Sequence, residues 1–162
     1  MGHIASLLPS SNVVLDMPAA NKRAVFEQVA ALLEGKTGVK RGQILDSLLA
    51  RERLGSTGLG QGIAIPHGRV RGLRDAVGAF LRTRTPIDFE APDDLPVNLI
   101  FVLLVPEKST DLHLEILSEL AQIFSDREFR SQLAQASDAV AAQRLIVSWQ
   151  SESPSLRPNA TG

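Results

Sequence analysis

The sequence predicts a single α/β domain in which helices cover both faces of a β-sheet, and three observations lead to this prediction. The 162 residues are 44% hydrophobic and 22% charged, which is sufficient for one well-formed hydrophobic core. Residues 97 to 105 form an almost uninterrupted apolar run, which is typical of a strand buried on both faces. Apolar residues at helical spacing precede and follow this run, so amphipathic helices are available to cover it.

The first third of the chain predicts one strand and three helical segments. Residues 1 to 11 are expected to form a short helical lead-in, and residues 13 to 15 a short strand. Residues 21 to 34 place apolar side chains at helical spacing with charged side chains opposite, and Gly35 is expected to end this helix. A second amphipathic helix is predicted over residues 41 to 53.

The middle of the chain predicts three strands. A short apolar run at residues 62 to 65 and a longer one at residues 76 to 84 are the first two. The third is the apolar run at residues 97 to 105. Residues 86 to 96 are rich in proline and aspartate, so they are expected to connect the last two strands.

Three helices are predicted after the last strand. The first carries an apolar stripe over residues 112 to 124, with N-cap candidates at residues 109 to 111. Ser125 and Glu128 have the spacing of a capping box, which predicts the start of a second, short helix. The third helix is expected over residues 138 to 149.

The helical patterns stop before the C-terminus of the chain. Residues 151 to 162 are polar, contain two prolines and have the composition of a disordered tail. We therefore expect the folded domain to span residues 1 to 150.

The composition excludes several classes of function. The formal net charge of −1 provides no strongly basic field, so we expect no binding of nucleic acid. The chain has no cysteine, which excludes disulfides, thiolate metal sites and a cysteine nucleophile. The N-terminus lacks the features of a signal peptide, and no apolar run approaches the ~18 residues of a membrane span. We therefore expect a soluble cytoplasmic protein without membrane insertion.

The glycine-rich stretch from Arg51 to Arg69 is organised to present one histidine. Pro66 restricts the backbone before His67, and Gly68 is expected to let the chain leave His67 at backbone angles that other residues resist. The imidazole is therefore predicted at a strand end, pointing outward. Histidine can transfer a proton, bind a metal or accept a phosphoryl group near neutral pH, and one histidine alone leaves these three roles open.

Charged residues and a second histidine are expected near His67. Arg51, Arg53 and Arg69 flank it in the sequence, although cations at the end of a helix are also stabilising by about 0.3–1 kcal/mol without any function. His113 lies in the first turn of a predicted helix, where the dipole and free N–H groups favour an anion and a neutral imidazole. The alternative for His113 is a boundary residue packed over an apolar face.

The glycines from Gly55 to Gly62 do not match a nucleotide-binding loop. A P-loop requires a Gly-Lys-Ser/Thr ending, and the dinucleotide fingerprint requires glycine where this chain has Ile63 or Ile65. We instead predict a tight turn that pairs the strand at residues 62 to 65 with a neighbouring strand.

Four separated segments together resemble one protein family. These are residues 55 to 69 (GSTGLGQGIAIPHGR), 86 to 89 (PIDF), 101 to 106 (FVLLVP) and 113 to 117 (HLEIL). In this order they closely resemble the IIA component of the bacterial phosphoenolpyruvate-dependent phosphotransferase system. Within the fructose/mannitol class the nitrogen-regulatory branch fits best, and the resemblance covers roughly residues 5 to 150.

The resemblance implies a fold and a set of site residues. It implies a mixed β-sheet flanked by helices on both faces, which is a three-layer α/β/α domain. His67 matches the histidine that accepts a phosphoryl group from a histidine phosphocarrier protein, HPr or its nitrogen-type homologue, as a tele-phosphohistidine. His113 matches the second active-site histidine, and Arg51 an arginine near the phosphoryl group. Four further residues are assigned to binding: Ser56, Thr57, Gly68 and Arg69. The family uses no cofactor, and no metal is expected.

The implied function is that of a phosphotransferase component acting as a regulator. We expect a cytoplasmic phosphoprotein of the nitrogen-regulatory type, whose phosphorylation state controls its binding to regulatory protein targets. The chain ends shortly after the matching segment, which favours a free-standing regulator over a component fused to a sugar permease. The targets, the phosphocarrier that donates and the formation of a homodimer stay open.

Three alternatives are weighed against this function. The chain could pass phosphate to a fructose/mannitol-type sugar permease. A metal-assisted hydrolase with His67 and His113 as ligands would need a third protein ligand, and no His-Glu-x-x-His cluster is present. A protein-interaction module that is never phosphorylated is disfavoured, because His67, His113 and Arg51 are all retained.

Overall fold

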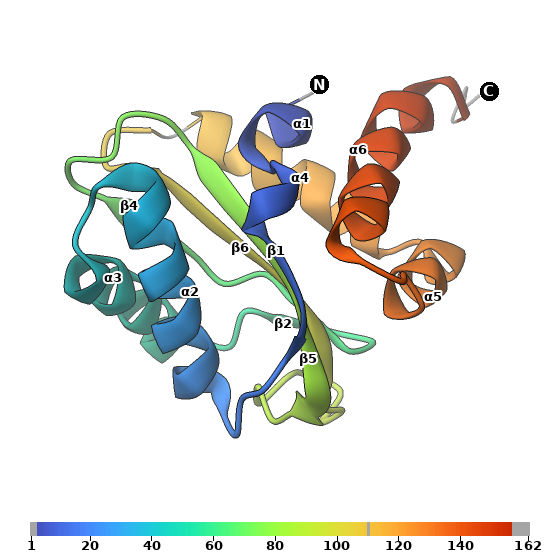
Figure 1. Cartoon of the computed structure of the whole chain (residues 1–162), viewed down its shortest axis with the longest axis horizontal. Helices are drawn as coiled ribbons and strands as arrows, with labels where there is room; N and C mark the ends of the chain where they lie inside the picture. Colours follow the sequence, from blue (N-terminus) through green and yellow to red (C-terminus); the bar gives the residue numbers. More distant parts are fainter. Residues whose placement is uncertain (1–2, 110, 157–162) are drawn as a thin grey trace.

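A six-stranded mixed sheet lies between two layers of helices in the computed structural model, which describes residues 3–109 and 111–156 (Figure 1). The strands are β1 Val13–Met17, β2 Gly58–Gly60, β3 Ile63–Ala64, β4 His67–Val70, β5 Val77–Ile87 and β6 Val97–Pro106. The helices are α1 His3–Leu7, η1 Ser10–Asn12 (a 3₁₀ turn), α2 Lys22–Thr37, α3 Arg41–Leu54, α4 Asp111–Phe124, α5 Arg127–Ala134 and α6 Ala139–Leu156.

Strand β6 is the centre of the sheet. The strand order is β1-β5-β6-β3-β2, and β4 also pairs with β6. Strands β3 and β4 run parallel to β6, whereas β5 is antiparallel to it and β1 is parallel to β5. β3 and β4 pair with successive parts of β6 on the same side of it. Between them lie Ile65 and Pro66, which form a break in what would otherwise be one continuous strand.

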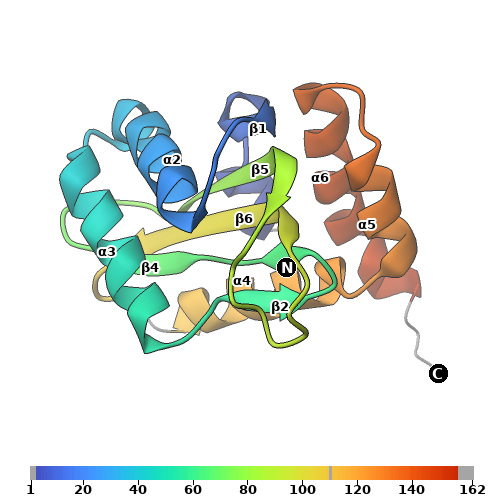
Figure 2. The same ribbon diagram turned by 90° about the horizontal axis from the view of Figure 1, so that it is seen from below.

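Successive side chains of β6 enter two different cores, as the period of a strand requires. Leu99, Phe101, Leu103 and Val105 pack with apolar residues of α1, α4, α5 and α6. Ile100, Val102 and Leu104 pack on the other face with residues of α2 and α3. Figure 2 shows the same division, with α2 and α3 on one side of the sheet and α5 and α6 on the other. The three-layer α/β/α prediction is confirmed.

The predicted turn between glycines is present. β2 pairs antiparallel with β3 through a two-residue connection, Gln61 and Gly62. Their φ angles are 60° and 82°, and a tight hairpin turn of the type I′ class requires positive φ at both positions. The carboxylate of Asp93 accepts a hydrogen bond of 2.8 Å from the N–H of Gln61, which secures the turn against the 88–96 connection.

Helix α2 ends later than the sequence predicts. Gly35 lies inside the helix, and the chain turns at Gly38, whose φ of 81° is left-handed and whose N–H donates to the carbonyl of Glu34. At the other end Asn21 caps the helix by accepting from the N–H of Ala24. The expected stop at Gly35 was therefore wrong, because a glycine ends a helix only where the backbone adopts the left-handed conformation.

Helix α5 has a different N-cap from the predicted one. Asp126 caps it by accepting from the N–H of Phe129, whereas the Ser125 hydroxyl donates back to Gln122 at the end of α4. The second oxygen of Asp126 accepts from the indole N–H of Trp149 on α6. The capping box from Ser125 was therefore wrong by one residue, and Asp126 links α5 to α6.

The ends of two predicted segments fall partly outside the described residues. Helix α4 begins at Asp111, and the N-cap candidate at position 110 is not described. Helix α6 continues to Leu156, beyond the helix end predicted at 149 and into the predicted tail. Residues 157–162 are outside the described range, so the division into a domain of 1–150 and a tail of 151–162 stays a prediction. Within residues 3–109 and 111–156, no helix is both long and apolar enough to cross a membrane.

Candidate functional site

His67 is the first residue of β4, immediately after the break in the line of strand beside β6. Ile65 and Pro66 form this break: the N–H of Ile65 donates to the carbonyl of Thr57 at 3.0 Å, and the carbonyl of Pro66 accepts from Leu103 at 2.9 Å. These bonds fix the backbone on both sides of the break. The His67 side chain is partly exposed, so its predicted place at a strand end is confirmed.

Gly68 is required for close packing between α3 and β4. A Cβ at this position would collide with the Ser47 side chain and approach its carbonyl carbon to 3.4 Å. The φ of Gly68 is not positive, so the expected need for unusual backbone angles was wrong. The absence of a side chain lets α3 lie directly on β4, and Arg51, one helical turn beyond Ser47, is thereby placed beside His67.

We predict opposite effects on stability for alanine at two glycines of this region. Gly68→Ala should destabilise the fold by about 1–3 kcal/mol, because α3 must move away from β4. Gly42→Ala should stabilise it by up to about 1 kcal/mol, since Gly42 is helical and its Cβ would meet open space. Urea denaturation followed by circular dichroism measures both. Gly68→Ala should recover part of its loss in a Ser47→Ala background; no recovery would contradict the packing explanation.

The two hydrogen bonds of His67 define its tautomer. Nδ1 lies 2.8 Å from the carbonyl oxygen of Ile65, which can only accept, so Nδ1 carries the proton. Nε2 accepts from Nε of Arg51 at 3.3 Å. The imidazole is therefore neutral, with its lone pair on Nε2 and directed to the side where Arg51 lies. A second nitrogen of Arg51, Nη1, donates to the carbonyl of Gly55 at 2.8 Å, which fixes the guanidinium.

His113 lies in the first turn of α4 and faces His67. The ring centroids are 5.2 Å apart and the ring planes are inclined by 72°. His113 is only 8% exposed, and neither of its ring nitrogens has a hydrogen-bond partner among the described residues. A buried polar group without a partner costs free energy. This cost is recovered if a group that binds in front of His67 also reaches His113.

Burial lowers the pKa of both histidines below the ordinary value of 6.5. For His67 the charge of Arg51 lowers the pKa further, against the raising effects of the Ile65 carbonyl and of Glu52. For His113 the charge of His67 in its protonated form and the charge of Arg69 also lower the pKa. Both rings are therefore neutral at neutral pH, and His67 keeps a free nucleophilic nitrogen.

These pKa shifts predict that acid destabilises the fold in the range where histidine titrates. Below pH 6.5 the unfolded chain binds more protons at His67 and His113 than the folded chain does, so stability falls as pH falls. Urea unfolding between about pH 7.5 and about pH 5.5 measures this slope. His113→Gln should flatten it. A fold whose stability rose on acidification in this window would contradict the lowered pKa values.

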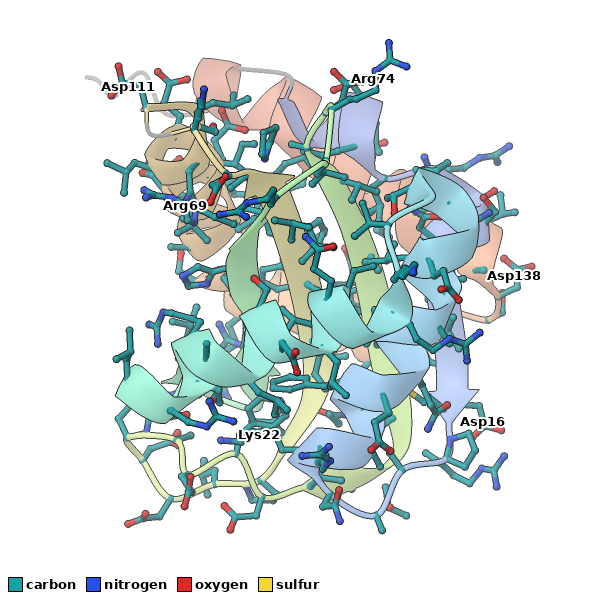
Figure 3. All side chains as sticks on the ribbon, turned by 90° about the vertical axis from the view of Figure 1, so that its left-hand side faces the viewer. Asp16, Lys22, Arg69, Arg74, Asp111 and Asp138 are labelled. Carbon is teal, nitrogen blue, oxygen red and sulfur yellow. The ribbon has the colours of Figure 1, made fainter. Side chains whose placement is uncertain are left out.

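A pocket of about 430 Å³ opens over the two histidines and is lined by Ser47, Ala50, Arg51, Leu54, His67, Gly68, Arg69 and His113. Arg69, two residues after His67 on the same face of β4, adds a second cation, and Figure 3 labels it on the side of the molecule where α4 begins. At the rim, Leu54 is 84% exposed. The site is thus a shallow, positively charged pocket with an apolar edge.

Five of the predicted site residues meet in this pocket: Arg51, His67, Gly68, Arg69 and His113. Two do not line it. Ser56 donates to the carbonyl of Phe89 at 2.5 Å, and the Thr57 hydroxyl donates to Glu52 at 2.7 Å. Both side chains therefore hold the loop rather than face the pocket. Arg53 is exposed and is likewise absent from the lining.

Sequence reasoning did not single out Glu52. It lies between two arginines in the last turn of α3, yet its side chain is only 6% exposed and contacts Lys22 and Thr57. One signal was available: a carboxylate at the end of a helix is unfavourable to the helix dipole, so its presence there calls for a partner elsewhere.

Few side chains in the pocket could act as ligands to a metal ion. His67 and His113 offer two imidazoles, and the described part of the chain gathers no group of three or more His, Cys, Asp or Glu side chains. A zinc site needs at least three protein ligands.

Comparison with known proteins identifies relatives over almost the whole chain. Residues 6–149 match the family described as "Phosphoenolpyruvate-dependent sugar phosphotransferase system, EIIA 2". A nitrogen regulatory protein of Pseudomonas aeruginosa is 39% identical over 148 residues, which are 91% of this chain and 96% of that protein. A fructose-specific EIIA component of Haloferax volcanii is 34% identical over 144 residues, which are 88% of this chain and 94% of that protein.

A solved structure extends the similarity to the fold. The crystal structure of the nitrogen regulatory protein IIA-Ntr from Neisseria meningitidis has a TM-score of 0.85 and 49% sequence identity, covering 88% of this chain and 98% of that chain. The resemblance inferred from the four sequence segments is confirmed. The chain belongs to the EIIA 2 family of the phosphoenolpyruvate-dependent sugar phosphotransferase system.

Proposed function

We propose that Nε2 of His67 accepts a phosphoryl group from a histidine phosphocarrier protein, HPr or a nitrogen-type homologue. The observation that carries this proposal is the neutral imidazole of His67, whose proton is held on Nδ1 by Ile65 and whose lone pair on Nε2 faces Arg51. Membership of a family of phosphotransferase components supports it. The product is a tele-phosphohistidine.

The transfer exchanges one N–P bond for another. As the lone pair of Nε2 forms the new bond to phosphorus, the bond to the donor's imidazole breaks and its electron pair returns to the donor ring. Arg51 releases Nε2 and turns its N–H toward a phosphoryl oxygen. No proton is lost or gained overall, and because both bonds join phosphorus to histidine, the exchange lies near equilibrium.

The surroundings of His67 stabilise the charge that moves with phosphorus. A loose phosphoryl-transfer transition state spreads charge over three equatorial oxygens, so catalysis consists of positioning and electrostatic stabilisation. Arg51 and Arg69 supply cations, and His113 supplies an N–H that has no partner among the described residues. The N-terminal turn of α4, which holds His113, adds the positive end of a helix dipole.

Phosphorylation would then switch the binding of regulatory proteins. A phosphoryl group adds a charge of about −1.5 to −2 to a pocket that is bordered by the exposed side chain of Leu54. An apolar partner surface that contacts Leu54 would bind beside the unphosphorylated site, whereas it would bind the phosphorylated site less well because the phosphoryl charge would lose its hydration. In line with its relatives named nitrogen regulatory protein, we propose that this chain is a nitrogen-regulatory IIA protein that acts in the cytoplasm.

A second candidate function is supported by the fructose-specific relative. The same phosphohistidine would pass its phosphoryl group to the IIB domain of a fructose- or mannitol-type permease. The two functions differ in the acceptor, because a regulator keeps its phosphate in the presence of a IIB domain and a sugar component loses it.

A phosphorylation assay tests the proposal. The chain is incubated with labelled phosphoenolpyruvate, enzyme I and either HPr or a nitrogen-type phosphocarrier in parallel. We expect labelling of the wild-type chain with at least one of the two carriers, and the faster reaction identifies the donor. Absence of label with both carriers would refute phosphoryl acceptance. If the chain is labelled, addition of a IIB domain separates the two candidate functions.

A further inference from the structure

The Glu52 carboxylate at the end of α3 is buried and almost fully hydrogen-bonded. Its side chain is 6% exposed. Oε2 accepts from Nζ of Lys22 at 3.0 Å and from the N–H of Thr57 at 3.0 Å, and Oε1 accepts from the Thr57 hydroxyl at 2.7 Å. Removing a charge from water is unfavourable unless such bonds replace its hydration. Glu52 therefore has a defined task within the fold.

Lys22 completes the charge balance of this group. The Lys22 side chain is 18% exposed. Its ammonium lies 5.1 Å from the centre of the Phe89 ring, which is a cation–π arrangement. Lys22 also contacts Glu90 at 3.4 Å, but that carboxylate is 79% exposed and, among the described residues, forms no hydrogen bond to the loop after α3. Glu52 and Glu90 thus share one cation, and Glu52 alone bonds to Thr57.

The hydrogen bond at Nδ1 of His67 leads back to Thr57. Nδ1 donates to the carbonyl of Ile65, and the N–H of Ile65 donates to the carbonyl of Thr57 at 3.0 Å. Glu52 holds Thr57 through both its N–H and its hydroxyl. The carbonyl that selects the tautomer of His67 is therefore anchored, through residues Ile65 and Thr57, to the buried carboxylate.

The hydrogen bond at Nε2 of His67 leads back to the same loop. Nε of Arg51 donates to Nε2, and Nη1 of Arg51 donates to the carbonyl of Gly55. Gly55 has a φ of +154°, a conformation that residues with a Cβ rarely adopt, and it lies two residues before Thr57. Holding the loop at Thr57 therefore also holds the Gly55 carbonyl, and this carbonyl orients the guanidinium of Arg51.

We propose that Glu52 and Thr57 are positioning residues for phosphoryl transfer: by holding the loop from Gly55 to Thr57, they set both hydrogen bonds of the His67 ring. This inference rests on the proposed function of His67. It assigns Thr57 to orientation of the histidine instead of to binding of the phosphoryl group. Neither Glu52 nor Thr57 touches the reacting atoms.

Thr57→Val and Thr57→Ser test the proposal as a matched pair. Valine keeps the shape and the backbone N–H but leaves Oε1 of Glu52 without the hydroxyl, whereas serine keeps the hydroxyl. We expect Thr57→Val to lower kcat for labelling at least about tenfold with KM for the phosphocarrier unchanged, because misplacement affects the transition state and not docking. Thr57→Ser should stay near the wild-type rate.

Nitrogen-15 NMR of His67 gives a readout that does not depend on activity. In the wild type the shifts should report a proton on Nδ1. In Thr57→Val the two tautomers should mix, because Arg51 and Ile65 lose their fixed places. If Thr57 only stabilised the fold, the tautomer of His67 would be unchanged in every folded molecule of Thr57→Val.

Glu52→Gln and Glu90→Gln provide the second variant and the control. Each removes one carboxylate charge beside Lys22, but only Glu52 bonds to Thr57. We expect reduced kcat and a mixed tautomer in Glu52→Gln, and wild-type values in Glu90→Gln. The proposal is overturned if folded Glu52→Gln and Thr57→Val keep the wild-type kcat and the wild-type tautomer of His67. It is also overturned if Glu90→Gln lowers kcat as much as Glu52→Gln does. A wild-type chain that takes no label would refute phosphoryl acceptance, while the tautomer comparison would still decide the role of Glu52.

Discussion

Replacing His67 by alanine is expected to abolish phosphoryl uptake while leaving the fold intact. The variant lacks the neutral imidazole whose Nε2 lone pair faces Arg51 at the pocket; the other ring there, His113, is 8% exposed. His67 is partly exposed and lies at the first position of an edge strand, so its removal leaves no core cavity. Label from phosphoenolpyruvate through enzyme I and the phosphocarrier measures uptake, and circular dichroism checks the fold.

His113→Gln is the matched control for this prediction. It removes the second imidazole of the pocket and keeps His67, so label should still enter, at a lower rate, because one donor to the phosphoryl oxygens is lost. Full labelling of His67→Ala would exclude His67 as the acceptor. If that label then disappeared in a folded variant carrying both His67→Ala and His113→Gln, His113 would instead be the acceptor.

Replacing Arg51 by alanine is expected to lower kcat for phosphoryl uptake by about 10²-fold or more, in the range observed when a donor to transition-state charge is removed. Arg51 contacts the attacking nitrogen and is held by the Gly55 carbonyl. Arg51→Lys keeps the charge but cannot make both bonds with one rigid group, so it should restore only part of the rate. Single-turnover labelling with excess phosphocarrier measures the effect.

Arg53→Ala is the control for the role of Arg51. Arg53 belongs to the same last turn of α3 and carries the same charge, but it is exposed and absent from the pocket lining. Its replacement should leave kcat unchanged. If both variants lost the same factor, the effect would come from the general positive charge of this helix end and not from the contact with His67.

Much of the fold follows from periodicity in the sequence. The apolar run at residues 97 to 105 predicted a strand between two layers, and β6 has side chains in both cores. The helical spacing of apolar residues predicted α2 and α3 within a few residues of their ends. These features depend on neighbours along the chain, so the sequence alone contains them.

Features that depend on contacts between distant segments could not be predicted. The need for glycine at position 68 arises from Ser47 on a packed helix, and no local pattern reveals that contact. Glu52 resembles a surface residue until Lys22 is placed against it, thirty positions away in the sequence. The helix stop at Gly38 instead of Gly35 likewise depends on backbone angles, which glycine permits at both positions.

The candidate site was predictable as a set of residues but not as a geometry. The family resemblance pointed to His67, His113 and Arg51, and the structure brings them into one pocket. The tautomer of His67 could not be predicted from the sequence. It depends on the carbonyl of Ile65, which the break between β3 and β4 turns toward Nδ1. For the same reason the sequence assigned Thr57 to binding, whereas its hydroxyl donates to Glu52 in the structure.

The site of the new N–P bond is the most direct test of this mechanism. The chain is labelled with nitrogen-15, phosphorylated through its carriers, and examined by phosphorus and nitrogen NMR. Because Nδ1 carries the proton that Ile65 accepts and Nε2 carries the lone pair, we predict phosphorus coupled to Nε2 of His67. Coupling to Nδ1, or to a nitrogen of His113, would contradict the account.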